Sequence, residues 1–495
     1  MTSTTTTESS AGTEDRKRWL TLYVLCVGML MIILDGTIVN VALPSIQESL
    51  GFSQSSLAWV VNAYLIPFGG LLLLAGRLGD LISRRTMFLS GIGVFVVASA
   101  LAGAAASQEM LIGARFIQGV GGAMASAGIL GMIVTMFPQP GEQAKAIGVY
   151  SFVASAGASI GLLLGGVLTE AISWHWIFFV NLPIGVATAF AASRLLERDR
   201  GHGLEHGADV PGAALITSSL MLGVYTIVEA ADYGWGSART LILGAISLIL
   251  LAGFVRREQT TSNPLMPLRI LRSRNVSGAN AIQILMVAGL FGMFFLGALY
   301  LQQVQGYGAV DVGLAFLPVS IGIGFFSFSI SPALVTRYGG RPVLIGGLTL
   351  VAAGLALFTR APVDASYVTD ILPTMVLFGI GAGLSFPALV TLAMSGATNE
   401  DAGLASGLVN TTQQVGGALG LAVLATLSTS RSEDLLAAGD PTASALTDGY
   451  QLAFTVGLGF VLVAIAVATR VLQPEHEAAA AQARAQGADG DLVLE

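Results

Sequence analysis

Charged side chains are scarce in this sequence. They make up 11% of the 495 residues, whereas hydrophobic side chains make up 54%. A soluble domain usually carries about 25% charged residues, so this chain has too few to cover a water-facing surface of its size. Acidic residues outnumber basic ones by 30 to 23, which leaves no basic surface of the kind that binds nucleic acid. The composition therefore excludes an ordinary cytosolic enzyme, a disordered protein and a nucleic-acid-binding protein.

Residues that bind metals or carry out redox chemistry are also rare. The single cysteine, Cys26, lies in a hydrophobic run, which excludes a disulfide framework and a cysteine-based zinc site. Among the four histidines, His202 and His206 are four residues apart, but they lie in a glycine-rich, charged loop, and we interpret them as solvated residues. The sequence has no HExxH motif, no Walker loop and no Ser–His pairing signal. We expect no metal, no cofactor and no enzymatic activity.

Long hydrophobic runs dominate the rest of the chain. A bilayer core about 30 Å thick needs about 20 apolar residues per helix, and fourteen runs approach or exceed this length. The runs do not alternate apolar and polar residues as the strands of a membrane barrel do, so they predict helices. Their approximate spans are 19–44, 57–77, 86–106, 108–136, 143–169, 175–194, 209–229, 238–255, 276–302, 310–336, 342–360, 367–395, 402–428 and 449–471.

Basic residues predict the orientation of these helices. Lys and Arg accumulate in short loops on the cytoplasmic side of a membrane. With the N-terminus inside, 19 of the 23 basic residues fall in inner segments, and only Arg239, Arg360 and Arg431 fall in outer loops. We therefore expect a multi-pass protein of the plasma membrane with both termini in the cytoplasm. The excess of arginine over lysine is compatible with a bacterial, GC-rich genome.

Two polar segments divide the chain into two six-helix bundles and an inserted helix pair. The loops at 76–85 and 332–341 each follow the second helix of their bundle and have leucine and arginine in register, which indicates a repeat of the kind found in secondary transporters. The predicted division is a cytoplasmic N-terminal tail (1–18), an N-terminal bundle (19–200), an inserted pair (201–275), a C-terminal bundle (276–472) and a disordered cytoplasmic tail (473–495).

Five motifs, in order along the first six helices, resemble those of one family. They are LDGTIVNVALP at 34–44, GRLGDLISRR at 76–85, RFIQGVGG at 115–122, GASIGLLLGG at 157–166 and WHWIFFVNLP at 174–183. Together they are similar to the fourteen-helix drug:proton antiporter branch of the major facilitator superfamily. The sequence departs from the family pattern at Ser83, usually Gly, and at Leu162, usually Pro. In addition, Asn62 stands where some multidrug members carry an acid.

The resemblance implies a membrane transporter with an all-helical major facilitator fold. It implies proton-driven export of lipophilic drugs or antibiotics. The expected protein is a monomer in the lipid bilayer, and its expected partners are protons and a small lipophilic or monocationic substrate. Because one fold hosts many cargoes and directions, the alternative is proton-coupled uptake, or lipid or metabolite transport.

Asp35 is the sharpest chemical signal in the sequence. It is the only carboxylate well inside any predicted span, and an acid at membrane depth costs at least about 2.5 kcal/mol on insertion scales. Ionisable residues at that depth usually mark ion pathways, so we predict that Asp35 carries the proton. Arg115, inside the fourth span, is the predicted partner that responds to its charge. The alternative is that the two residues only form a pair that fixes the first and fourth helices.

Asp80 and its neighbours Arg77, Arg84 and Arg85 form the second predicted site. The resemblance implies that Asp80 caps the N-terminus of a helix in the other bundle, near Asp401, and so latches the cytoplasmic side in one state. The alternative is a loop whose arginines only follow the positive-inside rule.

Two further groups of residues are weaker candidates. Gly157, Gly161 and Gly165 are spaced by four and line one face of the fifth helix, where small residues allow close packing or a hinge. The candidate substrate-cavity residues are polar or aromatic and lie deep in the spans. They are Asn62, Tyr64, Gln118, Asn280, Gln283, Asn410 and Gln414.

Overall fold

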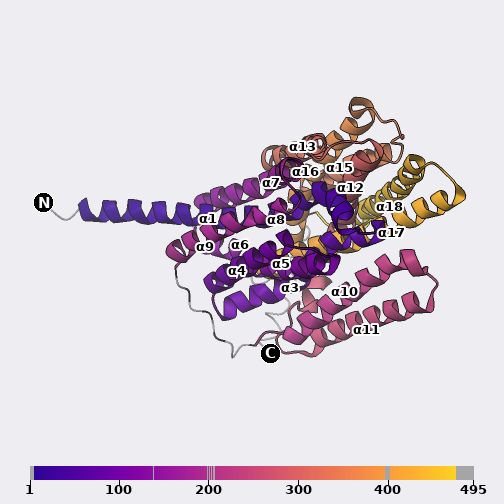
Figure 1. Ribbon diagram of the computed structural model, residues 1–495. Helices are drawn as coiled ribbons and strands as arrows, with labels where there is room; N and C mark the ends of the chain where they lie inside the picture. The colour runs from indigo at the N-terminus through magenta and orange to yellow at the C-terminus, as the bar shows by residue number, and fades with distance from the viewer. Residues whose placement is uncertain are drawn as a thin grey trace.

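The computed structural model describes residues 5–137, 139–197, 199, 201, 203, 207–395 and 402–474, and this part of the chain is helical throughout, without a strand (Figure 1). The prediction of an all-helical fold is confirmed. The N-terminal half comprises α1 (Thr5–Leu50), α2 (Gln54–Leu57), α3 (Trp59–Leu81), α4 (Arg84–Gly103), α5 (Gln108–Ser126), α6 (Ile129–Met136), α7 (Pro140–Ala171), α8 (Trp176–Phe179) and α9 (Asn181–Leu195).

Two long helices follow, and then the C-terminal half. The inserted pair is α10 (Val210–Tyr233) and α11 (Ala238–Thr260). The C-terminal half comprises η2 (Leu268–Arg272), α12 (Arg274–Leu299), η3 (Tyr300–Val304), α13 (Ala309–Phe325), η4 (Phe326–Ile330), α14 (Ser331–Tyr338), α15 (Gly340–Phe358), η5 (Tyr367–Ile371), α16 (Leu372–Ser395), α17 (Ala402–Ala438) and α18 (Thr442–Arg470).

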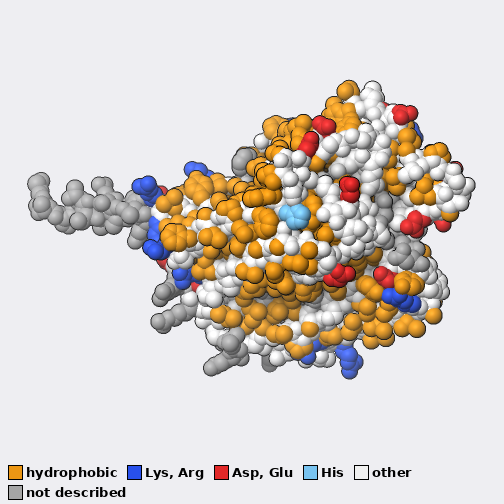
Figure 2. Space-filling view, viewed as in Figure 1, with side chains coloured by type: hydrophobic (Ala, Val, Ile, Leu, Met, Phe, Trp, Pro, Cys, Tyr) orange, Lys and Arg blue, Asp and Glu red, His pale blue; other side chains and the backbone are white. Residues whose placement is uncertain are grey.

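Each of the fourteen predicted spans falls on one helix or on consecutive helical segments. Within the described residues, twelve helices are long and hydrophobic enough to cross a bilayer. The other two predicted spans, 143–169 and 402–428, fall on α7 and α17. The visible surface is broadly hydrophobic, with basic side chains gathered where the chain begins and along the lower edge, and acidic ones mostly toward the right (Figure 2). An apolar surface of this extent fits a lipid environment.

The helices of the two halves pack against each other along two lines. Helix α3 contacts α17, and α7 contacts α13. The inserted pair lies side by side at the edge of the molecule, with α10 against α3 and α17 (Figure 1). We call inner the side where α3 ends and α4 begins, which is the predicted cytoplasmic side, and outer the opposite side, where α1 ends.

The three spaced glycines of α7 face α1. A β-carbon at Gly157 would contact the side chains of Leu30 and Ile33, and one at Gly165 would lie 2.6 Å from the backbone oxygen of Ile38. Gly161 is pressed against Thr37 in the same way. The structure thus places these glycines in a tight helix–helix packing surface, because lipid supplies no hydrophobic force and only small residues let backbones approach this closely.

A short linker segment after α9 joins the ends of α3 and α4 on the inner side. The carboxylate of Asp199 accepts hydrogen bonds from the Ser83 hydroxyl at 2.5 Å and from the backbone N–H of Arg84 at 2.7 Å. The backbone N–H groups of Gly201 and Gly203 donate to carbonyl groups at the end of α3. We call Asp199, Gly201 and Gly203 the linker clip. It satisfies backbone groups that helix termini leave without intrahelical partners.

Ser83, where the family pattern usually has Gly, is therefore a contact residue of this clip. Partial burial by itself would raise the pKa of Asp199, but the hydrogen bonds from Ser83 and from the backbone of Arg84 and Arg85 outweigh it and hold the pKa below its ordinary value. A depressed folded-state pKa adds stability that is complete above the ordinary value and is lost as the pH falls below it.

We predict that Asp199→Asn lowers the stability of the purified protein by about 1 kcal/mol at neutral pH, since it weakens a helix cap. Thermal unfolding in detergent, followed from pH 7 downward, measures the effect. The stability difference between the wild type and the variant should be largest at neutral pH. It should shrink as the pH falls below 3.8, the ordinary pKa of an aspartate side chain. Glu197→Gln, which removes an exposed ion pair with Lys17, is the matched control and should have little effect. Equal effects of both variants would refute the capping role.

Candidate functional site: a buried ion pair in the N-terminal half

Asp35 and Arg115 form an ion pair that is completely buried. Oδ2 of Asp35, in α1, lies 2.5 Å from Nη1 of Arg115, in α5, and neither side chain has any solvent-exposed area. The two charges that the sequence analysis expected to be partners are thus in direct contact. Because isolated charges are costly to bury, each depends on the other to remain ionised inside the protein.

Two amide side chains complete the surroundings of the carboxylate. Nε2 of Gln118 and Nδ2 of Asn181 donate to Oδ1 of Asp35, at 2.6 Å and 2.8 Å. The oxygen of Gln118 accepts from Nη1 of Arg115 at 2.7 Å, so this side chain touches both charges. The hydroxyl of Ser99 accepts from Gln118 at 2.9 Å and from Asn181 at 3.4 Å. The network joins α1, α4, α5 and α9.

The guanidinium group of Arg115 is held on its other sides by aromatic and backbone groups. Its Nε donates to the backbone oxygen of Val60 at 3.0 Å, and its carbon lies 4.4 Å from the ring centre of Tyr64 and 5.6 Å from that of Phe178. A cation over an aromatic face is favourable, more so where water is excluded. Tyr64, a predicted cavity residue, is in this structure a platform for Arg115.

Glycine residues on α5 allow this arrangement. A β-carbon at Gly119 would collide with the backbone oxygen of Tyr64 and with Pro67, and one at Gly121 would lie 2.6 Å from the backbone nitrogen of Phe95. Helix α5 therefore packs closely against both α3 and α4. Without that approach, Arg115 would not reach the carbonyl group of Val60.

The network has one reversible chemical property, namely that a proton can neutralise Asp35. Protonation would remove the counter-charge of Arg115, and an unpaired buried cation is strongly unfavourable. Two polar atoms beside the pair, Nη2 of Arg115 and Oδ1 of Asn181, have no hydrogen-bond partner within the described residues. The proton-coupling role of Asp35 and Arg115 stays a prediction.

The predicted latch residues are placed only in part. Asp80 pairs with Arg84 one turn away, with a distance of 2.9 Å between Oδ1 and Nε. Arg85 donates to the backbone oxygen of Ser193 at 2.7 Å, and Arg77 is exposed. The predicted partner, the helix N-terminus near Asp401, lies outside the described residues. The latch stays a prediction.

The remaining predicted cavity residues are distributed over three helices, α3, α12 and α17. Asn62 is completely buried, and neither of its polar side-chain atoms has a partner among the described residues. Gln283 is buried with an unpartnered Oε1. The oxygen of Asn280 accepts from the hydroxyl of Thr412 at 2.8 Å. Gln414 packs against Gly69 of α3, whereas Asn410 is exposed.

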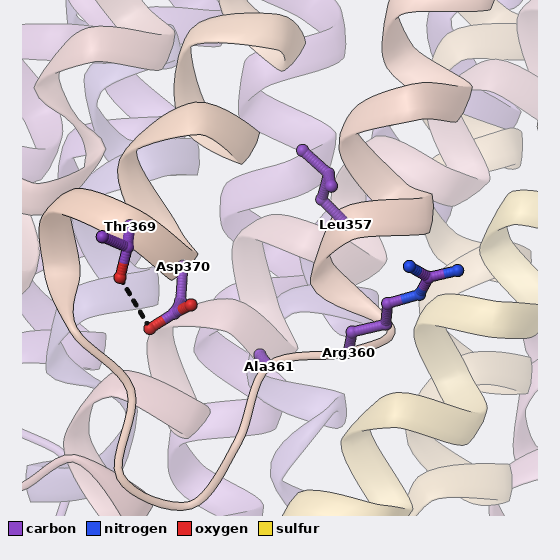
Figure 3. Close-up of a pocket in the computed structure, with 5 residues that line it drawn as sticks. All are labelled: Leu357, Arg360, Ala361, Thr369 and Asp370. Atoms are coloured by element: carbon purple, nitrogen blue, oxygen red, sulfur yellow. Dashed lines mark hydrogen bonds between the residues drawn. The ribbon is translucent and has the colours of Figure 1, made fainter.

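A separate small pocket lies at the outer ends of α15 and α16. It is lined by Leu357, Arg360, Ala361, Thr369 and Asp370. The Asp370 carboxylate accepts from Thr369, and the Arg360 side chain points away from it (Figure 3). The two charges do not converge on a shared space, so the pocket is no candidate for the functional site.

Sequence reasoning did not assign a role to two members of the charge network. Asn181 stood within a recognised motif, and Ser99 stood in a hydrophobic run without any signal. Gln118 was predicted as a cavity residue, but the structure places it between the two charges. The sequence shows which residues share a face of one helix. It does not show which neighbouring helix that face contacts, so the roles of Asn181 and Ser99 could not be predicted.

The fold and the buried charge network define a multi-pass membrane transporter. A profile of the Major Facilitator Superfamily matches residues 25–421, and the chain belongs to this family. The resemblance inferred from the five motifs is confirmed.

Curated relatives extend over nearly the whole chain. The puromycin resistance protein pur8 of Streptomyces alboniger is 41% identical over 461 residues, covering 92% of this chain and 91% of that protein. The cephamycin export protein CmcT of Amycolatopsis lactamdurans is 37% identical, covering 91% and 92%. Among solved structures, a bacterial homologue of the human lysosomal transporter Spinster, in an inward-facing, unoccupied conformation, has a TM-score of 0.64 at 16% identity, covering 92% and 98%. This last likeness supports the fold alone.

We predict that Asn181→Leu lowers the stability of the protein by about 1–3 kcal/mol, because it leaves a buried carboxylate with one donor fewer. Denaturant-induced unfolding in detergent provides the measurement. Thr188→Val on the same helix is the matched control, since the buried Thr188 hydroxyl donates only to the backbone oxygen of Ile184. If Asn181→Leu were no more destabilising than Thr188→Val, Asn181 would not be supporting Asp35.

Proposed function

We propose that this protein exports antibiotics or other lipophilic, neutral or monocationic drugs from a bacterial cell in exchange for protons, as a monomer without a cofactor. The observation that carries the proposal is the buried Asp35–Arg115 pair. It is a titratable charge at membrane depth whose protonation alters the balance of a helix–helix network. The names of the relatives, which refer to puromycin resistance and cephamycin export, support drugs as the cargo.

In the proposed cycle, Asp35 accepts a proton while it is accessible from outside. The neutral acid no longer holds Arg115 as strongly, and Arg115 shifts toward Gln118 and the aromatic rings beside it. Because α1 and α5 carry the two charges, the bundle changes its internal packing. Opening toward the cytoplasm then lets Asp35 release the proton and restore the pair. One charge moved across 100 mV is worth about 2.3 kcal/mol, which is available to expel the drug.

Hydrogen bonds join the two halves on the outer side. Nε2 of Gln302 donates to the backbone oxygen of Val41 at 3.1 Å, and Nε2 of Gln303 donates to Oε1 of Gln47 at 3.0 Å. Both donors lie in the π-helical turn η3, a type of turn often found at functional positions. We call Val41, Gln47, Gln302 and Gln303 the outer amide contact.

Uncharged amides suit a contact that must break in every cycle. Neutral hydrogen bonds contribute only about 0.5–1.5 kcal/mol each, because water replaces them when they open. Glu170 adds a further contact between the halves on the same side, accepting from the backbone N–H of Val310 at 3.1 Å. We infer that outward opening separates these groups as the N-terminal bundle (19–200) and the C-terminal bundle (276–472) rock against each other, with both termini inside.

The candidate cargo contacts are neutral amides. Asn62 and Gln283 are buried and have polar atoms without partners among the described residues. A buried, unpaired amide is unfavourable, so a bound drug with donor or acceptor groups would stabilise it. Such surroundings suit lipophilic molecules with few charges and do not suit polyanions, which would need several cations.

We predict that Asp35→Asn reduces proton-driven drug export at least about tenfold, because the site can no longer exchange a proton. Asp35→Glu, which keeps the acid, should retain a measurable part of the activity. Everted membrane vesicles with an acidic interior, supplied in the outer medium with a chemically broad drug panel that includes puromycin, provide the assay.

Controls for this experiment must separate coupling from folding. Loss of one partner of a buried ion pair can cost about 3–5 kcal/mol, so the amount of folded protein is measured for each variant. Glu48→Gln, which removes an exposed acid near the outer end of the same helix, should export normally. Undiminished export by folded Asp35→Asn would contradict the proposed mechanism.

A further inference from the structure

Two further acids are buried at the inner end of the inserted helix pair. Asp209 is the N-cap residue of α10, and Glu258 lies in the last turns of α11. They are only 3% and 4% exposed. The sequence analysis treated neither as a membrane-depth acid, because both stand at the edges of hydrophobic runs. The proposed transport cycle makes no use of them.

Each carboxyl group has one oxygen that is well bonded. Oδ1 of Asp209 accepts from the backbone N–H of Gly212 at 3.0 Å and from Nε of Arg257 at 2.5 Å. Oε2 of Glu258 accepts from the backbone N–H of Met266 at 2.7 Å. These contacts explain the positions of both side chains. They also use only half of the acceptor capacity of the two groups.

The two other oxygens are buried and lie near the same point beside Gly212. Within the described residues, neither Oδ2 of Asp209 nor Oε1 of Glu258 has a hydrogen-bond partner. A β-carbon placed on Gly212 would contact Oδ2 of Asp209 and lie 3.2 Å from Oε1 of Glu258. Two ionised carboxylates in this arrangement would repel each other and leave buried acceptors unsatisfied, which is costly.

The charges around the pair do not remove this conflict. Arg257 bonds only to Asp209 in the described ion pairs and offsets one negative charge. Arg77 on α3 and Arg256 on α11 have exposed side chains. Residues 204–206, which precede α10 in the sequence, lie outside the described part of the chain. With both acids ionised, the group of Asp209, Glu258 and Arg257 would carry a net negative charge in a buried position.

We propose that Asp209 and Glu258 form a second proton-binding site, in which one proton bridges Oδ2 of Asp209 and Oε1 of Glu258. The proton turns two unsatisfied acceptors into a donor and an acceptor, and it balances the charge of the group against Arg257. The site is separate from the Asp35 pair and does not depend on the proposed direction of transport or on its cargo.

The bridge fastens the inserted pair to the transport bundle. Glu258 holds the backbone of Met266 in the segment after α11. Leu265 in that segment packs with Ala213 of α10, Phe254 of α11 and Leu74 near the inner end of α3. Loss of the proton would set two charges against each other beside this small core. The site thus ties the docking of α10 and α11 on α3 to the proton occupancy of Asp209 and Glu258.

Infrared spectroscopy of the purified protein tests the proposal directly, because a protonated carboxyl group has a carbonyl stretching band that an ionised one lacks. The wild type at neutral pH should show this band, with the shift expected on exchange into D2O. Glu258→Gln and Asp209→Asn should each lose the equivalent of one carboxyl group. Glu229→Gln, at the outer end of α10 and paired with Arg239, is the matched control and should lose none.

Each outcome of this test decides the proposal. Absence of a protonated carboxyl band in the wild type at neutral pH would overturn it even if neither variant folded. A band that persists undiminished in folded Glu258→Gln would also overturn it. Displacement of the band by sodium chloride but not by choline chloride would show a cation in place of the proton. A band lost in both variants, kept in the control and insensitive to sodium would support the shared proton.

Discussion

A single buried ion pair constrains how the N-terminal half of this protein is built. Asp35 and Arg115 have no contact with solvent, so neither charge is tolerable unless the other is within bonding distance and the remaining polar atoms are satisfied. This requirement fixes the separation of α1 and α5. It also accounts for Gln118, Asn181 and Ser99, whose polar groups would otherwise be costly in a hydrophobic bundle.

Close packing is the second condition, and glycine provides it. Gly119 lets α5 touch α3, and Gly161 and Gly165 let α7 touch α1, so the charged pair lies among helices that cannot move apart without losing extensive contact. A helix bundle packed in this way adopts a few discrete conformations, because tightly packed interfaces either fit or separate. Uncharged contacts between the halves, such as Gln303 with Gln47, can open at small cost and complement the rigid bundle.

Much of the architecture could be predicted from the sequence because hydrophobic length and arginine placement are properties of single helices. The importance of Asp35 and Arg115 followed from the cost of burying a charge, which needs no coordinates. The partners of the pair could not be predicted, since they depend on which face of each helix meets its neighbour. Asp209 and Glu258 escaped notice because an acid at the edge of a hydrophobic run is usually interfacial. Here both acids are buried, and the backbone N–H of Met266, in the segment after α11, donates to Glu258.

The central claim is that protonation of Asp35 drives the change between inward and outward access. Double electron–electron resonance between spin labels at Ser49→Cys in α1 and Asp311→Cys in α13, with Cys26 replaced by serine, measures the separation of the two halves on the outer side. Both labelled positions are exposed. The account predicts that lowering the pH shifts the wild-type background toward the shorter separation, because protonation turns the protein toward the cytoplasm, and leaves the separation unchanged in Asp35→Asn. An equal response to pH in both backgrounds, or no response in either, would contradict it.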